Sequence, residues 1–338
     1  MTILRPQDFG ATDNTGERDE SEALQDAIDA VSGTRHILDL DGGNWRYRRQ
    51  LIMQGTVRIR NGQLSYAGPD NTVSIVARPK PETEAPGIGP LESNMVKKSP
   101  KEKATLIMQD VCIHHVQCKN QVGMQIENGF RVSLQRVNFT NWRNGGTALR
   151  LEGVQLGRFE DCMIEDCYTS MVITGLHLGP PSTALTFTHC QFRSHFASGS
   201  SVLLLPYNPD AVVAGSWDNN KQKASGARKC VFEYCYFEEG RHGGYIEAHS
   251  TRFMTLFNCY FEDPADGFSS LELLDEIGES LSNKVMYCTF SNTHGSNQPA
   301  HIRIGPNVRR TLLIGNSHAI GSVAVDDNGS GTTILQQN

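Results

Sequence analysis

Four glutamates that recur at matching positions are the residues of this sequence best suited to chemistry. Glu238 and Glu262 each follow a Phe, and Glu247 and Glu272 each lie inside a short alternation of apolar and polar residues. Two nearby carboxylates are what glycoside hydrolysis requires, since one acts as the acid and the other as nucleophile or base. A separation of about 5 Å would suit a retaining mechanism, and a wider one inversion. These four are the candidate catalytic residues.

Elimination is an alternative to hydrolysis at the same carboxylates. A polysaccharide lyase would need a basic group beside them, and His242, His249, Arg241 and Tyr245 surround Glu247 in the sequence. The sequence therefore leaves both kinds of bond cleavage open.

The candidate substrate-binding residues are Trp217, Arg303 and Tyr245. Trp217 lies among polar residues, where an aromatic ring can stack on a sugar or on a neighbouring subunit. A structural interpretation stays open for the whole set, because solvent-facing carboxylates are ordinary on a protein surface. Glu272 beside Arg303 would then be an exposed ion pair that adds little stability.

We expect neither a metal nor a cofactor. The pairs Cys162/Cys167 and Cys230/Cys235 are each separated by four residues, a spacing that departs from zinc-ligand patterns. The sequence also lacks a phosphate-binding glycine motif. A stack of cysteines inside a repeated structure explains these residues better.

A repeated phrase determines where the glutamates lie. It consists of an aromatic or polar residue, then Cys, any residue and Phe, and its clearest copies are 189–192, 234–237, 258–261 and 287–290. Counted at the Cys position, with Val at the two earliest copies, the phrase occurs at 111, 137, 162, 190, 235, 259 and 288, in steps of 26, 25, 28, 45, 24 and 29. Such a period marks a stacked repeat architecture.

A second phrase follows each copy, and most of these phrases alternate apolar and polar residues, as a half-buried strand does. Its predicted outward positions are Gln125, Arg150, Val172, Leu204, Glu247, Glu272 and Arg303. Each repeat thus supplies at least two short strands without a helix, and one turn cannot bury its own apolar face. The sequence predicts an all-β fold, a single-stranded right-handed parallel β-helix in which like residues stack about 4.8 Å apart.

Residues 1–35 differ from the rest and predict an N-terminal cap with an amphipathic helix. Asp19 is the expected N-cap with Glu22 three residues later, an apolar stripe follows, and Gly33 ends the helix. Residues 36–338 then form the solenoid, with loop insertions at about 77–103 and 206–229 where the pattern stops. The final coils show no clear cap, which suggests that another chain covers them.

The composition argues against two kinds of partner, nucleic acid and a membrane. The net charge is −6, so no basic face indicates nucleic acid, and no apolar run approaches the roughly 20 residues that span a membrane. We expect no signal peptide, because the N-terminus lacks a charged leader and an apolar core. The nine cysteines predict reduced thiols in a protein made in a cytosol.

The cap resembles a known superfamily. Residues 8–11, Asp-Phe-Gly-Ala, and 19–28, which end in Ala-Leu-Gln-Asp-Ala-Ile, resemble the opening of pectate-lyase-like β-helix proteins, and 38–45 resemble the strand and glycine turn that follow. Members without a signal peptide are often bacteriophage tailspikes and related virion proteins. The resemblance implies a fold better than a function, since one solenoid hosts lyases, hydrolases and inert parts. No residues match a pectate-lyase calcium and arginine site.

Two function classes follow. The first is a bacteriophage virion-surface structural protein, tailspike-like or capsid-decorating. It would be a homotrimer that contacts other virion proteins and binds bacterial surface polysaccharide. Because the cap begins within ten residues of Met1, a compact decoration or a spike subunit attached through its own loops is favoured. The alternative is a polysaccharide depolymerase that uses the stacked carboxylates.

Overall fold

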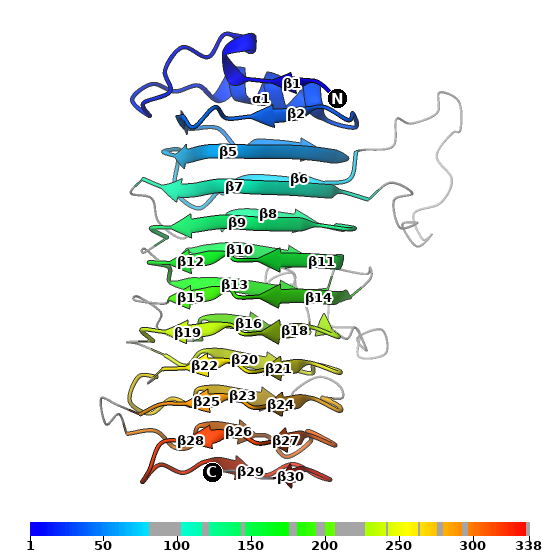
Figure 1. The fold of residues 1–338 in the computed structure, drawn as a ribbon, viewed down its shortest axis with the longest axis vertical. Helices are drawn as coiled ribbons and strands as arrows, with labels where there is room; N and C mark the ends of the chain where they lie inside the picture. Colours follow the sequence, from blue (N-terminus) through cyan, green and yellow to red (C-terminus); the bar gives the residue numbers. More distant parts are fainter. Residues whose placement is uncertain are drawn as a thin grey trace, which may run out of the picture.

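The chain winds into a right-handed parallel β-helix, as the repeat predicts. The computed structural model describes residues 1–80, 103–116, 122–142, 146–175, 181–193, 200–206, 227–240, 243–262, 264–275, 280–292 and 297–335. Coils stack along the long axis from the N-terminal cap to the last strands near the C-terminus (Figure 1). Every strand pairing in the described residues is parallel, and partners come from successive coils.

Each coil contributes strands to three faces of the solenoid. The first face comprises β1 (Ile3–Leu4), β2 (Ile37–Asp39), the first halves of β5 (Thr56–Tyr66), β7 (Thr105–His115) and β9 (Ser133–Thr140), then β11 (Gln155–Glu160), β14 (Ser182–Thr188), β17 (Ala227–Arg228), β18 (Val231–Glu233), β21 (Thr255–Phe257), β24 (Lys284–Met286), β27 (Leu312–Ile314) and β30 (Thr333–Leu335).

The second face carries β3 (Asn44–Tyr47), the second halves of β5, β7 and β9, then β12 (Met163–Glu165), β15 (Gln191–Arg193), β19 (Tyr236–Glu238), β22 (Tyr260–Phe261), β25 (Thr289–Phe290) and β28 (Ser317–His318). The third face is a separate ten-stranded sheet of β4 (Leu51–Gln54), β6 (Val73–Arg78), β8 (Val122–Glu127), β10 (Thr147–Glu152), β13 (Thr169–Thr174), β16 (Val202–Leu204), β20 (Ile246–His249), β23 (Leu271–Leu274), β26 (Ile302–Ile304) and β29 (Val325–Asp327).

The bend between the first and second faces is made by the residue before the repeat position, which is Val, Cys or Asn at 111, 137, 162, 190, 235, 259, 288 and 316. This residue has a left-handed backbone in successive coils, with φ between 50° and 60° at Asp110, Arg136, Asp161, His189, Tyr234, Asn258, Tyr287 and Gly315. Gly315 has a second reason to be glycine, because a Cβ there would lie 2.7 Å from the Tyr287 ring. The residue that follows the bend, a Val, Cys or Asn, is buried in the interior.

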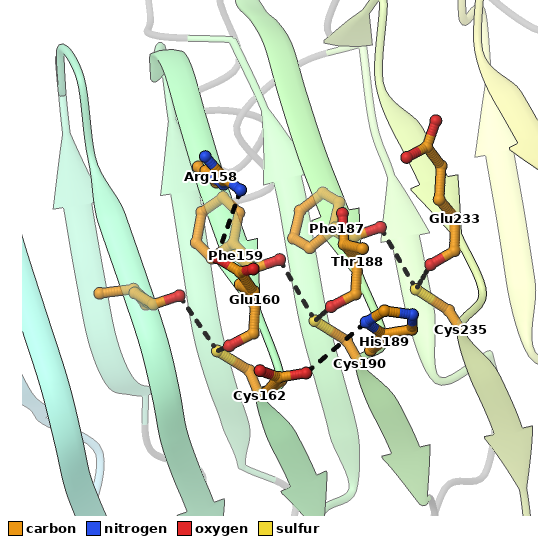
Figure 2. Close-up of polar contacts among 12 residues, drawn as sticks. Arg158, Phe159, Glu160, Cys162, Phe187, Thr188, His189, Cys190, Glu233 and Cys235 are labelled. Atoms are coloured by element: carbon orange, nitrogen blue, oxygen red, sulfur yellow. Dashed lines mark hydrogen bonds and ion pairs between the residues drawn. The ribbon is translucent and has the colours of Figure 1, made fainter.

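The cysteines form an internal ladder at this bend. The Sγ of Cys162 lies 3.4 Å from the Leu134 carbonyl oxygen one coil earlier, and Cys190 and Cys235 repeat the contact at 3.5 and 3.4 Å (Figure 2). All eight cysteines within the described residues are free, as predicted. Burial raises the pKa of the Cys230 thiol to about 12, so this thiol stays protonated at neutral pH.

Aromatic rings fill the rest of the core. Phe192, Phe237, Phe261 and Phe290 stack from coil to coil with centroids 5.0, 4.6 and 4.8 Å apart. These spacings match the distance between hydrogen-bonded strands, so each ring lies over its equivalent in the next coil. The Phe of the repeated phrase is thus the core residue of the second face.

The N-terminal cap closes the first coil. Helix α1 (Ser21–Val31) buries Leu24, Ala27, Ile28 and Val31 against the solenoid after the short 3-10 helix η1 (Pro6–Phe9). The predicted N-cap was wrong by one residue: Glu20 is the N-cap, and Asp19 instead accepts a hydrogen bond from the Ser21 N–H at 3.2 Å. The helix ends at Val31 with Ser32 as the C-cap, one residue before Gly33.

Most of both predicted insertions lies outside the described residues. Their predicted ends are strand, because β6 continues to Arg78 and β17 occupies Ala227–Arg228. Within the described residues, no helix combines the length and the apolar composition needed to cross a membrane.

Candidate functional site

The first predicted carboxylate ladder lies on the outward side of the second face. Strand pairing aligns Glu165 with Arg193 and Arg193 with Glu238. Glu262 continues the column directly after β22, where its N–H donates to the Phe237 carbonyl at 2.8 Å. Glu238 and Glu262 therefore occupy adjacent coils, as the repeat predicted.

Arg193 forms ion pairs with two glutamates of this column and with the adjacent Glu239. Its guanidinium nitrogens lie 3.8 Å from Glu165, 3.4 Å from Glu238 and 3.0 Å from Glu239. The Glu239 N–H also donates to the Glu262 carboxylate at 2.7 Å. One cation among four carboxylates leaves the cluster with an excess of negative charge, which the protein tolerates because each side chain is still partly exposed.

The electrostatics of Glu238 reflect that excess. Its pKa is raised, first by partial burial and then by the nearby Glu262 and Glu239, against the opposing effect of Arg193. Such a carboxyl keeps its proton to a higher pH than an isolated glutamate, and it can donate a hydrogen bond to a ligand.

Two tyrosines flank the cluster. Tyr236 and Tyr260 precede Glu238 and Glu262 by two residues, so alternation places them on the same outward side. They pair in register, their ring centroids lie 6.2 Å apart, and Tyr236 is 44% exposed. The second face therefore presents an aromatic platform next to carboxylates and a guanidinium.

The second predicted ladder lies on the third face. Glu247 pairs with Glu272 and Glu272 with Arg303 in strands β20, β23 and β26. An Arg303 nitrogen lies 3.5 Å from the Glu272 carboxylate, and half of the Arg303 side chain is exposed. The predicted ion pair is confirmed, and Arg303 is accessible to a ligand.

Glu247 and Glu272 differ in ionisation although they are neighbours. The His249 ring lies 2.5 Å from the Glu247 carboxylate and Ser200 donates to it at 3.2 Å, and these hydrogen bonds lower the pKa of Glu247. Partial burial raises the pKa of Glu272, against the attraction of Arg303. Environments that separate two carboxylate pKa values in this way are typical of acid and base pairs.

One outward position predicted for the second ladder was wrong. Leu203, rather than Leu204, faces outward, because Leu203 pairs with Val172 and Glu247 while Leu204 pairs with the inward Ile173 and Ala248. Leu204 is fully buried. Four consecutive apolar residues at 202–205 hide the alternation that fixed the register in other coils.

The three predicted substrate-binding residues differ in position. Arg303 lies in the third-face cluster. Tyr245 is fully buried, and its hydroxyl accepts a hydrogen bond from the Gly240 N–H at 3.1 Å. A ring inside the core offers no surface to a sugar, so Tyr245 is a packing residue instead. Trp217 lies outside the described residues, as do Arg241 and His242.

In the cysteine pairs considered as zinc ligands, thiols donate hydrogen bonds to backbone carbonyls. Cys167 donates to the Glu165 carbonyl at 3.0 Å and Cys235 to Phe187 at 3.4 Å. Among the residues that the structure describes, no group of three or more His, Cys, Asp or Glu side chains is arranged to hold a metal ion.

Sequence reasoning missed Arg193 and the tyrosine platform. Arg193 directly follows the Phe of the copy 189–192, at the same offset as Glu238 and Glu262 after theirs. A comparison of that offset in every copy would have found it. Tyr236 and Tyr260 occupy the variable position of the repeated phrase, and the repeat alone does not distinguish this position as part of a site.

Comparison with known proteins establishes the fold. No family model matches the chain, and no curated protein matches its sequence. The surface adhesin PfbA of Streptococcus pneumoniae aligns with a TM-score of 0.62 at 10% identity, over 99% of this chain and 89% of PfbA. The DFA-IIIase of Arthrobacter chlorophenolicus A6 aligns at 0.55 and 9% identity, over 99% of this chain and 94% of the enzyme.

A viral protein has the same architecture. The tailspike gp42 of Acinetobacter phage vb_AbaP_AS12 aligns with a TM-score of 0.53 at 11% identity, over 98% of this chain. The chain spans 63% of that tailspike's length. At these identities the similarity shows a common parallel β-helix fold, found in phage tailspikes, adhesins and enzymes alike.

Proposed function

We propose that the chain is a tailspike-like bacteriophage virion-surface protein whose second face binds a bacterial surface polysaccharide. The observation that carries this proposal is the platform of exposed Tyr236 and half-buried Tyr260 beside Arg193 and the glutamates. Tyrosine rings offer apolar faces for sugar rings at low entropy cost, and charged groups around them bind hydroxyls. The fold shared with a phage tailspike supports the virion assignment.

A polysaccharide-binding panel tests the proposal. Immobilised capsular and O-chain polysaccharides from many bacteria would be offered to the wild-type protein and to the double variant Tyr236→Ala/Tyr260→Ala. We expect binding to at least one polymer, weakened by about 10²-fold or more in the double variant if each ring contributes about 1.5 kcal/mol. Phe253→Ala is the matched control, since Phe253 is also exposed and lies on another part of the coil. Binding that survives in the double variant would refute the proposal.

We propose a homotrimer, with an apolar stripe on the first face as the contact between copies. Phe257, Met286, Ile314 and Leu335 align in successive coils and face outward. The rings of Tyr234 and Tyr287, which are 40% and 52% exposed, each lie 5.8 Å from Phe257. Extended apolar surface of this kind favours contact with another protein surface. Contacts with other virion proteins complete the proposed assembly.

A depolymerase is the second candidate, favoured by the different pKa shifts of Glu247 and Glu272. Glu272 would be the acid that keeps its proton, and Glu247 the ionised nucleophile or base. A reducing-end assay on the bound polysaccharide tests it. Glu272→Gln should then lower the release of sugar by about 10²–10⁴-fold. Asp326→Asn, two coils further in the same column, is the control. A wild type that releases no sugar would exclude the enzyme.

A further inference from the structure

A groove of about 460 Å³ opens on the second face at the N-terminal coils. Its volume falls within the range of small-molecule sites. The polar side chains that line it are four amides, one ion pair and one thiol: Asn44, Asn61, Gln63, Asn138, Asp110 with Arg136, and Cys112.

The groove is electrically balanced. Arg136 and Asp110 form a two-point contact in which Nη2 and Oδ2 lie 3.0 Å apart, so their charges cancel. Gln63 donates to the Ser65 hydroxyl at 2.8 Å, and Ser65 donates to Asn44 Oδ1 at 2.6 Å, which fixes two of the amides. Asn138 makes no side-chain hydrogen bond to any residue that the structure describes. Amides both donate and accept, as sugar hydroxyls do, so the lining suits an uncharged, hydroxyl-rich ligand.

Strand register connects this groove to the tyrosine platform. The column of outward residues runs Gln63, Cys112, Asn138, Met163, Gln191, Tyr236 and Tyr260, each paired with the next. Six steps of about 4.8 Å give a track of about 29 Å along one face of the solenoid. Asn138 and Tyr236 lie only three of these steps, about 14 Å, apart.

We infer that the groove is a second subsite for the same polymer, and that it takes an uncharged stretch of a polysaccharide that lies along the solenoid axis. This inference rests on the proposed function, since the polymer is held at Tyr236 and Tyr260. The protein would then bind long chains more tightly than short ones, because only a long chain reaches both subsites.

Cys112 provides a local readout of groove occupancy. It is half-buried in the groove, whereas the other cysteines of the described residues are buried. Octasaccharides and trisaccharides would be prepared from each neutral O-chain polysaccharide that binds. Iodoacetamide alkylation of Cys112 would then be followed by peptide mass spectrometry. We expect saturating octasaccharide to slow the alkylation, and saturating trisaccharide bound at the tyrosines to leave it unchanged.

Variants provide the matched comparison. Asn138→Ala should weaken octasaccharide binding by about 5–10-fold, the loss expected for one hydrogen bond, and leave trisaccharide binding unchanged. Gln135→Ala on the same strand β9 is the control, because Gln135 lies on the first face. Bound octasaccharide that leaves Cys112 unprotected, or a preference for charged polymers alone, would overturn the second subsite while the proposed function stands. Failure of every polysaccharide to bind would refute the proposed function itself, and this inference with it.

Discussion

Single residues with a left-handed backbone shape each coil of this solenoid. Besides the bend between the first and second faces, a second set occurs on the first face and includes Leu156, Ala184 and Phe253, with φ of 58°, 55° and 59°. Side chains with a Cβ rarely adopt this conformation, which costs roughly 1–2 kcal/mol per residue. The fold therefore stores strain that substitution can release.

Ala184→Gly should raise the stability of the protein. Relief of about 1–2 kcal/mol of strain exceeds the 0.5–1 kcal/mol that glycine loses through chain entropy, so we expect a net gain of about 0.5–1 kcal/mol. Thermal unfolding measures it. Ala319→Gly is the control, since Ala319 is not among the residues with positive φ and should lose about 0.5–1 kcal/mol. Equal losses in both variants would show that residue 184 is unstrained.

The carboxylates give a pH-dependent prediction. Because the pKa of folded Glu238 is raised, its ionised form opposes folding at pH 7, and this cost disappears below the ordinary glutamate pKa of 4.5. Glu238→Gln should therefore stabilise the protein at pH 7, by less than about 1 kcal/mol after solvent screening, and have no effect at pH 4.

The variant Glu247→Gln should have the opposite effect on stability at pH 7. The His249 hydrogen bond lowers the pKa of Glu247, so this carboxylate stabilises the fold above pH 4.5 and loses that contribution as the pH falls through its folded pKa. The variant should be less stable than the wild type at pH 7, with a smaller difference at acid pH. Melting temperatures at the two pH values measure both effects, and the same sign for both variants would contradict this account.

Among the elements, the stacked strands of the second face depend on the phenylalanine ladder. Phe261 lies between Phe237 and Phe290 and is fully buried. Phe261→Ala should cost about 3–5 kcal/mol, because it removes a ring from both neighbours and leaves a cavity. Phe253→Ala removes an exposed ring and should change stability by less than about 0.5 kcal/mol. Denaturant unfolding compares them, and similar losses would argue against a ladder that stabilises the coils.

The sequence predicted elements well where alternation is strict. Cys and Phe recur inward, and that register placed Glu238 beside Glu262 and Glu247 beside Glu272 correctly. The predicted register was wrong at Leu204, because the run of apolar residues around it carries no alternation. Tyr245 was misplaced for another reason: its proximity to Glu247 in the sequence suggested a site residue, but its ring is buried and its hydroxyl accepts a hydrogen bond from the Gly240 N–H. Such tertiary partners cannot be inferred from spacing.

At the scale of the whole molecule, the three faces suggest a division of roles. The second face carries the tyrosine platform and the amide groove, the first carries the apolar stripe, and the third carries the Glu247/Glu272 pair. A β-helix can separate binding from assembly in this way, because the strands of each face stack from coil to coil along the long axis (Figure 1).

The proposed trimer predicts a definite mass. Sedimentation equilibrium should give three chains of 37.3 kDa each. Tyr287→Glu should shift the equilibrium to monomers, because it places a charge on the exposed apolar stripe. Leu156→Glu is the control, since Leu156 is 48% exposed on the first face several coils earlier. A wild-type monomer at micromolar concentration would contradict the trimer.

Hydrogen exchange with bound polysaccharide tests whether the polymer binds at Tyr236 and Tyr260. Peptides that cover 191–193, 236–238 and 260–262 would be compared with those that cover 246–249, 271–274 and 302–304, with and without the polysaccharide that binds. We expect slower exchange in the second-face peptides and little change in the third-face peptides. Protection confined to the third face would contradict a binding site at Tyr236 and Tyr260 and would favour the Glu247/Glu272 pair as the site of carbohydrate chemistry.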